Sequence, residues 1–307
     1  MKRPSALAPG ATIALVAPAG PLAEGTVERA TERVERWGWR PWVGRHARGR
    51  FGYLAAPDAE RLADFNAALR DPRVDAVWCL RGGYGTLRIL PQIDWPALAA
   101  RPRALIGFSD NTALHLAAQR AGVVSFHGPH PATPQFSAFS EQVLLGVLTR
   151  PEPAGVLPFP AGAAPAQPLA GGVAEGPLVG GNLSLLAATL GTPYQLRAEG
   201  AILFLEEIGE PVYRVDRMLT QLRLAGALDG IAGVALGAFS ECPDDGDAAL
   251  PSTLELLRDR LADLGAPVAV GFPFGHVDEN WTLPLGVRAR LDADRGTLAL
   301  LEPAVAE

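Results

Sequence analysis

The stretch that decides the fold is residues 103–119, RALIGFSDNTALHLAAQ. Apolar residues at 104–106 and 108 form a short run typical of a buried parallel strand. Asp110 and Asn111 then offer helix-capping oxygens, and the apolar residues after them recur at helical spacing. Ser109 therefore stands where a predicted strand ends and a predicted helix begins.

A serine at such a junction has two interpretations. In a nucleophile elbow its hydroxyl projects from the carboxyl edge of the sheet, beside the first free N–H groups of the helix. The G-x-S-x-G form of that elbow is incomplete here, because Asn111 replaces the last glycine. Alternatively, Ser109 merely caps the helix, since serine is a preferred N-cap residue.

Composition indicates a globular protein of one large or two ordinary domains. The chain has 307 residues, of which 48% are hydrophobic and 20% charged. Its net charge of −6 and the absence of a Lys/Arg-rich run argue against nucleic acid as a partner. The two cysteines, Cys79 and Cys242, form neither a disulfide framework nor a metal motif, and Cys79 is predicted to be a core residue.

The N-terminus loosely imitates a secretion signal, because two basic residues precede an apolar stretch that ends near residue 20. Pro9 and Gly10 interrupt that stretch, so residues 12–17 are predicted to form a first strand instead. No apolar run has the length of a membrane span. We therefore expect a cytoplasmic protein without a membrane partner.

The N-terminal half alternates strands with helices, which predicts a parallel sheet covered on both faces. Residues 150–168 are rich in Pro, Ala and Gly, as expected of a segment that crosses between domains. We predict an α/β domain over residues 1–150, a crossing segment over 151–168 and a second domain over 169–307. Outside the opening stretch, the predicted strands are 12–17, 39–43, 76–80, 123–126, 201–205, 231–237, 268–271 and a pair within 287–301, and the predicted helices are 22–37, 58–69, the end of 180–190, 215–225 and 254–264.

Three stretches could perform chemistry. Residues 81–85, RGGYG, follow a predicted strand, and glycine there leaves backbone N–H groups able to hold an anion or an oxyanion; the alternative is a tight turn. Their spacing matches neither the dinucleotide nor the Walker fingerprint. Glu206 and Glu207 end a predicted strand on opposite faces, so at most one can line a cleft, and the alternative is a solvated strand end. Arg214 and Arg217 could bind a carboxylate or pair with nearby acidic residues.

The chain has five histidines, and no pair of them has the spacing of a metal site. We therefore predict neither a metal nor a cofactor. His276 lies in a polar loop, where a solvated side chain is the alternative to a catalytic one. His127 and His130 could line a cleft at a strand end, whereas His115 fits a packed core position.

Eight motifs in order make the sequence specific. They are APAG at 17–20, RGGYG at 81–85, GFSD at 107–110, FHGP at 126–129, GGNL at 180–183, LFLE at 203–206, YRVDRML at 213–219, and GH at 275–276 followed by TLPLG at 282–286. Through nearly its whole length the chain resembles the LD-carboxypeptidase family, the muramoyltetrapeptide carboxypeptidases, to which the microcin C self-immunity hydrolases are related.

That resemblance implies a serine peptidase with a Ser–Glu–His triad. The motifs place the triad at Ser109, Glu206 and His276. The implied fold joins the N-terminal parallel-sheet α/β domain to a C-terminal domain with a barrel-like sheet, and the active site lies in the cleft between them. The implied reaction releases the C-terminal D-Ala from muropeptide tetrapeptides during peptidoglycan recycling.

Two other functions stay open: a same-family hydrolase of peptidyl or aminoacyl nucleotides, and a non-catalytic module that binds an anionic ligand. Family members are often dimers, so we expect a homodimer. The expected oxyanion donors are the N–H groups of Asp110 and of Gly82 or Gly83, and the expected substrate-binding residues are Arg81, Tyr84, Asn182, Arg214 and Arg217.

Overall fold

The chain folds into two compact units in the structure, a computed structural model that describes residues 1–134, 136–242 and 251–307. The first unit comprises Met1–Glu152, Thr282–Gly286 and Pro303–Glu307, and the second comprises Pro153–Trp281 and Val287–Glu302. Two short segments from the C-terminal part of the chain therefore belong to the first unit. None of the helices in the described ranges is both long enough and apolar enough to cross a membrane.

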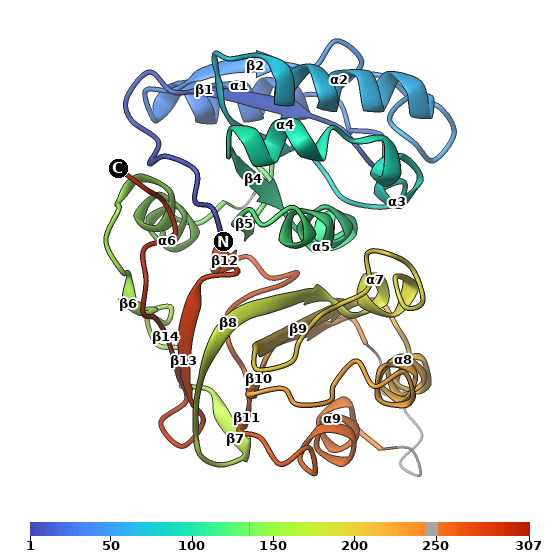
Figure 1. Cartoon of the computed structure of the whole chain (residues 1–307), viewed down its shortest axis with the longest axis vertical. Helices are drawn as coiled ribbons and strands as arrows, with labels where there is room; N and C mark the ends of the chain where they lie inside the picture. The colour runs from blue at the N-terminus through green and yellow to red at the C-terminus, as the bar shows by residue number, and fades with distance from the viewer. Residues whose placement is uncertain (135, 243–250) are drawn as a thin grey trace. The chain divides into compact units, whose positions relative to one another are not determined.

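The first unit is built on a six-stranded sheet in the order β12-β5-β4-β3-β1-β2. Its first five strands in the chain run parallel, and β12 joins the edge antiparallel to β5. Figure 1 shows α1, α2 and α4 lying along this sheet. The strands are β1 (Thr12–Val16), β2 (Arg40–Val43), β3 (Val74–Cys79), β4 (Ala104–Gly107), β5 (Ser125–His127) and β12 (Leu283–Leu285). The helices are α1 (Thr26–Arg36), α2 (Asp58–Arg70), α3 (Thr86–Ile89), α4 (Trp95–Ala100), α5 (Thr112–Arg120) and α6 (Ala138–Thr149), with 3-10 turns η1 (Leu90–Gln92) and η2 (Ser109–Asn111).

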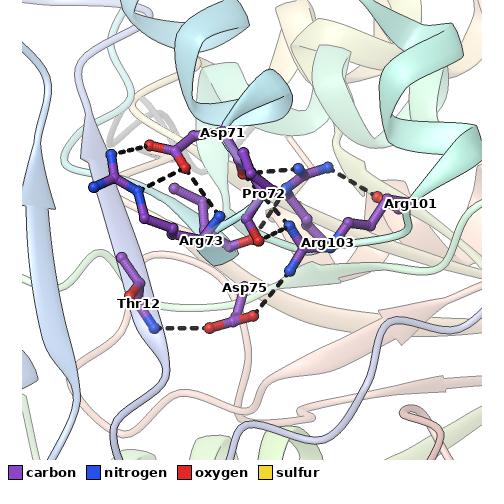
Figure 2. Close-up of polar contacts among 8 residues, drawn as sticks. Thr12, Asp71, Pro72, Arg73, Asp75, Arg101 and Arg103 are labelled. Atoms are coloured by element: carbon purple, nitrogen blue, oxygen red, sulfur yellow. Dashed lines mark hydrogen bonds and ion pairs between the residues drawn. The ribbon is translucent and has the colours of Figure 1, made fainter.

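A network of charged side chains closes the amino edge of this sheet (Figure 2). The pairing of β1 with β3 shifts register at Asp75, and its carboxylate accepts the Thr12 N–H at 2.9 Å. The same carboxylate pairs with Arg101 at 3.2 Å. The buried Arg103 donates to three main-chain carbonyls, those of Val74, Arg101 and Asp71, at 3.1, 3.0 and 3.0 Å. These side chains satisfy main-chain groups that the bulge and the strand ends leave without ladder partners.

The second unit contains an eight-stranded mixed sheet in the order β6-β14-β13-β8-β9-β10-β11-β7. Strands β8, β9, β10 and β11 are parallel neighbours, and the flanking pairs are antiparallel. Figure 1 shows α7, α8 and α9 gathered beside this sheet. The strands are β6 (Gly155–Val156), β7 (Gln167–Ala170), β8 (Val173–Asn182), β9 (Ile202–Ile208), β10 (Gly233–Ser240), β11 (Val268–Val270), β13 (Arg288–Asp292) and β14 (Thr297–Leu300), and the helices are α7 (Leu183–Ala188), α8 (Val212–Leu224) and α9 (Thr253–Leu261).

The predicted fold class is confirmed, except for the barrel-like form of the second sheet. A parallel α/β sheet forms in the N-terminal part and a second, mixed sheet forms in the C-terminal part. The barrel-like closure is not confirmed, because within the described ranges the two end strands, β6 and β7, are not paired with each other. The predicted hairpin near the C-terminus is present as β13 and β14.

Several predicted boundaries needed correction, and two of them concern residues of the expected site. Strand β9 continues to Ile208 instead of ending at residue 205, so Glu206 and Glu207 lie inside a strand and are both buried. Helix α8 begins at Val212 instead of 215, because Pro211 occupies the N-cap position, where proline's missing N–H costs nothing. The first correction matters for the site because the sheet fixes both carboxylates. The second places Arg214 and Arg217 well inside α8.

His115 is a packed core residue, as expected, and so are two of the other histidines. Its Nε2 lies 2.8 Å from the Gly107 carbonyl, which can only accept, so Nε2 carries the proton and Nδ1 accepts from the Ser125 hydroxyl at 3.0 Å. His127 and His130, which were candidates to line a cleft, are buried beside it or near it. Burial lowers the pKa of His115 to about 4, although the bond to Gly107 opposes that shift.

We expect this buried imidazole to make folding stability depend on pH. Its folded pKa, about 4, lies below the ordinary value of 6.5, so the unfolded chain binds more protons between these values. Stability is therefore complete above about pH 6.5 and falls by on the order of 3 kcal/mol towards pH 4. Urea unfolding between pH 7 and 4.5 measures this loss. His115→Gln should flatten the curve, and equal slopes for the two proteins would contradict the prediction.

Candidate active site

Ser109 has the backbone of a nucleophile elbow. Strand β4 ends at Gly107, Phe108 is extended, and Ser109 has a φ of 61° as the first residue of the 3-10 turn that leads into α5. Within the described ranges, only Ser109 and Glu241 are non-glycine residues with positive φ. The helix-cap interpretation is wrong, because neither the turn nor α5 has a side-chain cap bond at its N-cap. Left-handed backbone costs about 1–2 kcal/mol for a residue with a Cβ, so the turn holds Ser109 under strain.

We expect this strain to appear in the order of stability of two variants. Ser109→Gly should be more stable than Ser109→Ala by about 1 kcal/mol, because glycine adopts positive φ without penalty. At Ser140, which is buried inside α6, the same pair should show the opposite order, since glycine weakens helices. Chemical denaturation of the four variants measures both differences. The same order at both positions would contradict the strained elbow.

The glycine turn after β3 packs directly against Ser109. A Cβ placed on Gly82 would lie 2.9 Å from the Ser109 Cβ, 3.1 Å from its Oγ and 3.3 Å from the Asp110 nitrogen. Only glycine allows this approach, which brings the main chain of the turn beside the hydroxyl and beside the first N–H after it. The arrangement suits an oxyanion site made of main-chain N–H groups.

Gly82→Ala is expected to lower kcat by about 10²-fold, because the added methyl group displaces either the hydroxyl or the N–H groups beside it. Gly146→Ala is the matched control, since nothing lies within 4 Å of a Cβ at that helical position. Steady-state kinetics on both variants, with thermal unfolding as a check on folding, measures the difference. An unchanged kcat in Gly82→Ala would show that the turn has no part in the reaction.

The Asp110 carboxylate stabilises the end of the same turn. It is buried and accepts the Thr86 N–H at 2.9 Å, at the start of α3. Burial raises the pKa of Asp110, whereas hydrogen bonds from Thr86 and Gly85 and the charge of Arg61 lower it. Asp110 therefore has two roles. Its main-chain N–H is the first after Ser109, and its side chain fixes the turn that packs against Ser109.

A buried arginine that the sequence analysis missed ties the loops of this edge together. Arg61, on α2, donates to the Ala56 and Gly85 carbonyls at 3.0 Å each and also to the Pro18 carbonyl. Its guanidinium pairs with Asp58 as well. The three carbonyls belong to three separate loops at the carboxyl edge of the first sheet. No sequence signal distinguishes this arginine from a solvated one on a helix, because only the folded loops bring the carbonyls together.

In the second unit, Glu206 and His276 form a hydrogen-bonded pair. His276 Nδ1 lies 2.7 Å from Glu206 Oε2, and the carboxylate is fully buried whereas the imidazole is partly exposed. Burial raises the pKa of Glu206, the hydrogen bond and charge of His276 lower it, and the charge of Glu207 raises it further. A buried carboxylate in this position orients an imidazole and stabilises its protonated form.

The loop that carries His276 is fixed on both sides. Gly275 has a φ of 106°, and a Cβ there would lie 2.7 Å from the Glu206 Cβ. Asn280 closes the loop by accepting the Gly275 N–H at 3.2 Å and donating to its carbonyl at 2.7 Å. The Ser240 hydroxyl donates to the His276 carbonyl at 2.9 Å. The imidazole is therefore held by the sheet and by its own loop.

Glu207, the neighbouring carboxylate, has a different task. It accepts from the Ser184 N–H and hydroxyl at 2.8 and 2.7 Å and from the Asn182 amide at 2.9 Å. Asn182 in turn accepts the Leu185 N–H at the start of α7. Glu207 and Asn182 thus stabilise the junction of β8 with α7, which explains why both are buried. The solvated strand end, the alternative for the two carboxylates, is wrong.

The remaining predicted residues lie at the surface of their units. Arg81 is exposed and donates to the Pro21 carbonyl, and Tyr84 is half-exposed in the same loop region. Arg214 pairs with Glu210 at 3.3 Å, and Arg217 is exposed on the same helix. Among the residues that the structure describes, no group of three His, Cys, Asp or Glu side chains could hold a metal ion.

Comparison with known proteins shows the family of the chain. The N-terminal domain of LD-carboxypeptidases matches residues 13–128, and their C-terminal domain matches residues 175–291. A putative carboxypeptidase of Streptomyces coelicolor is 46% identical over 99% of this chain and 97% of its own. The chain belongs to the LD-carboxypeptidase family. It is therefore a peptidase, and the serine elbow and the His–Glu pair lie in the parts that match the two family domains.

Other members of the family are similar over most of their length. The murein tetrapeptide carboxypeptidase of Pseudomonas aeruginosa is 37% identical over 92% of this chain and 94% of its own. The crystal structure of muramoyltetrapeptide carboxypeptidase from Oxalobacter formigenes superposes with a TM-score of 0.81 at 34% identity, covering 94% of this chain and 97% of that one. The microcin C7 self-immunity protein MccF of Escherichia coli is 26% identical over 93% of this chain and 91% of its own. A structure of MccF with glutamyl sulfamoyl guanosine shares the fold, with a TM-score of 0.91 at 24% identity over 99% of both chains.

Proposed function

We propose that the protein is a serine carboxypeptidase that releases the C-terminal D-Ala from murein tetrapeptides. The observation that carries the proposal is the buried Glu206 carboxylate 2.7 Å from the imidazole of His276. Together with Ser109 at its elbow, this pair has the chemical composition of a Ser–His–Glu triad. The relatives named murein tetrapeptide carboxypeptidase and muramoyltetrapeptide carboxypeptidase support the substrate.

In the acylation step, His276 takes the proton from the Ser109 hydroxyl as the oxygen attacks the carbonyl carbon of the penultimate residue. Because Nδ1 donates its proton to Glu206, Nε2 is the nitrogen that acts as the base. The N–H groups of Asp110 and of Gly82 or Gly83 receive the developing oxyanion. His276 then gives its proton to the leaving amine of D-Ala, and an acyl-enzyme on Ser109 remains.

In the deacylation step, water replaces D-Ala as the acceptor of the acyl group. His276 takes a proton from the water as it attacks the ester and returns it to the Ser109 oxygen as that oxygen leaves. The products are a murein tripeptide and D-Ala. An exopeptidase also has to recognise the free carboxylate of its substrate, and Arg81, Arg214 and Arg217 are the candidates, since guanidinium binds carboxylates well.

Mass spectrometry of a digest tests this function. The purified protein is incubated with a murein tetrapeptide, and the expected result is loss of one alanine with no other cleavage. Ser109→Ala serves as the inactive control. The proposed reaction would be excluded if the tetrapeptide stayed intact under conditions in which the protein is folded.

A second candidate is the hydrolysis of peptidyl or aminoacyl nucleotides, which the similarity to MccF favours. The same triad would then attack the bond between the acyl group and the nucleotide part. Parallel digests of a tetrapeptide and of an aminoacyl sulfamoyl nucleotide distinguish the two, because the preferred substrate has the larger kcat/KM. A non-catalytic binding module would turn over neither compound.

We also propose that the protein acts in the cytoplasm and forms a homodimer. The proposed recycling of wall peptides supports the cytoplasmic location, and the family resemblance supports the homodimer. Cell fractionation tests the first, and light scattering of the purified full chain tests the second.

A further inference from the structure

Exposed aromatic side chains gather at the rim of the glycine turn in the first unit. Tyr53 is 65% exposed and Tyr84 is 50% exposed, yet their rings are in contact, with centroids 5.6 Å apart and planes at 61°. Phe51 is 59% exposed two residues before Tyr53. Exposed aromatic rings that pack on each other in water are typical of a binding surface, because rigid rings lose little entropy when a ligand covers them.

Hydrogen bonds and packing fix the main chain that carries the two tyrosines. Phe51 and Leu54 exchange two hydrogen bonds, of 2.8 and 3.0 Å, so Tyr53 lies at the tip of a tight turn. The Leu54 side chain packs against Gly85, where a Cβ would come within 2.5 Å of it. Arg61 fixes Gly85 in turn. The main chain that carries Tyr53 is therefore fixed, and so is Gly85, which follows Tyr84.

A polar pair lies within reach of the two rings. Arg88 and Asp58 are joined at 2.9 Å, and both side chains remain partly exposed, at 41% and 35%. The Arg88 N–H donates to the Gly85 carbonyl at 3.2 Å, so the pair lies one helical turn from the residue that follows Tyr84. The hydrogen bond to Asp58 raises the pKa of Arg88, so its guanidinium stays charged. The two tyrosine rings and this ion pair together form what we call the aromatic corner. It combines apolar ring faces with a planar donor and a planar acceptor.

We propose that Tyr53, Tyr84 and the Arg88–Asp58 pair form a subsite for a pyranose ring, namely the amino sugar that carries a murein peptide. The inference rests on the proposed function. Two rings at 61° make a corner in which a chair-shaped sugar can place C–H groups against both rings, whereas a flat nucleobase can lie parallel to only one of them. Arginine and aspartate supply hydrogen bonds of the kind that hydroxyl and acetamido groups accept and donate.

The distance from the serine fits a peptide substrate. Gly82 contacts Ser109, and Tyr84 follows two residues later, so the Cα atoms of Gly82 and Tyr84 are about 8 Å apart at most. The three residues that precede the scissile bond of a tetrapeptide span about 10 Å when extended. A sugar linked to the first of them can therefore reach the corner while the last peptide bond lies at Ser109.

Kinetics with two matched substrates test the subsite. The free tetrapeptide is compared with the same tetrapeptide linked to its amino sugar. Tyr53→Ala is expected to lower kcat/KM for the sugar-linked substrate by about tenfold, through KM, and to change it by less than about twofold for the free peptide. Tyr53→Phe keeps the ring and most of the affinity, and Tyr194→Ala, in the second unit, is the matched control. An equal loss on both substrates, or no loss on either, would overturn the subsite.

A binding measurement separates this proposal from the proposed function. Ser109→Ala cannot turn over substrate, so the affinity of the amino sugar alone for this variant, measured by NMR titration, does not depend on the reaction. Binding that Tyr53→Ala weakens supports the subsite even if the tetrapeptide is never cleaved. Binding that the substitution leaves unchanged, or a nucleoside that competes at the same tyrosines with higher affinity, rejects it.

Discussion

Ser109→Ala is expected to lower kcat by roughly 10⁴- to 10⁶-fold, because the variant has no atom that can form the acyl-enzyme. The residual activity would come from the oxyanion donors and from substrate binding, which the substitution leaves in place. The φ of 61° persists in the alanine variant, so the turn around Gly82 keeps its geometry. The loss should therefore appear in kcat and leave KM nearly unchanged.

Single-turnover measurements of tetrapeptide cleavage by the variant, with circular dichroism as a check on folding, test this predicted loss of kcat. Mass spectrometry of the native protein quenched during turnover should show one acyl group attached to a peptide that contains residue 109. A variant that retains wild-type turnover would remove Ser109 from the mechanism. It would also leave the strained elbow without a catalytic explanation.

Glu206→Gln is expected to lower kcat by roughly 10³- to 10⁴-fold while preserving the fold. The amide has the same shape as the carboxylate, but it cannot stabilise the imidazolium that forms when His276 takes the serine proton. It can also present its NH₂ group to Nδ1, which favours the wrong tautomer of His276. Because the carboxylate is fully buried, water cannot substitute for the lost charge.

The neighbouring carboxylate provides the control. Glu207→Gln removes a charge of the same sign from the same strand, but Glu207 holds Ser184 and Asn182 instead of the histidine. It should destabilise the protein with little effect on kcat. Steady-state kinetics and denaturation of both variants, side by side, separate orientation of His276 from general loss of stability. Equal losses of kcat would contradict the assignment of Glu206.

Local patterns predicted much of this fold because they are set by neighbours in the chain. The buried strand before Ser109 and the helix after it have opposite periodicities, and they are present as β4 and α5. The argument from alternation, that Glu206 and Glu207 must face apart, also agrees with their different partners. The family resemblance, however, was needed to connect Ser109 with residues that lie about a hundred or more positions away.

Features that depend on distant contacts were not predicted. Arg61 looks like an ordinary helical arginine until three loops present their carbonyls to it. The Asp110 carboxylate was expected to cap the helix that follows it, but it accepts the Thr86 N–H of a distant turn instead. Likewise, nothing in residues 282–286 distinguishes a strand of the first sheet from one of the second.

The late position of β12 affects how the protein is made. Its residues, 283–285, pair with β5 at the edge of the first sheet, although they leave the ribosome some 150 residues after β5 does. During that interval the outer edge of β5 presents unpaired N–H and C=O groups, which other nascent strands can join. A chain truncated before residue 283 leaves this edge open, and we expect it to aggregate more readily than the full chain.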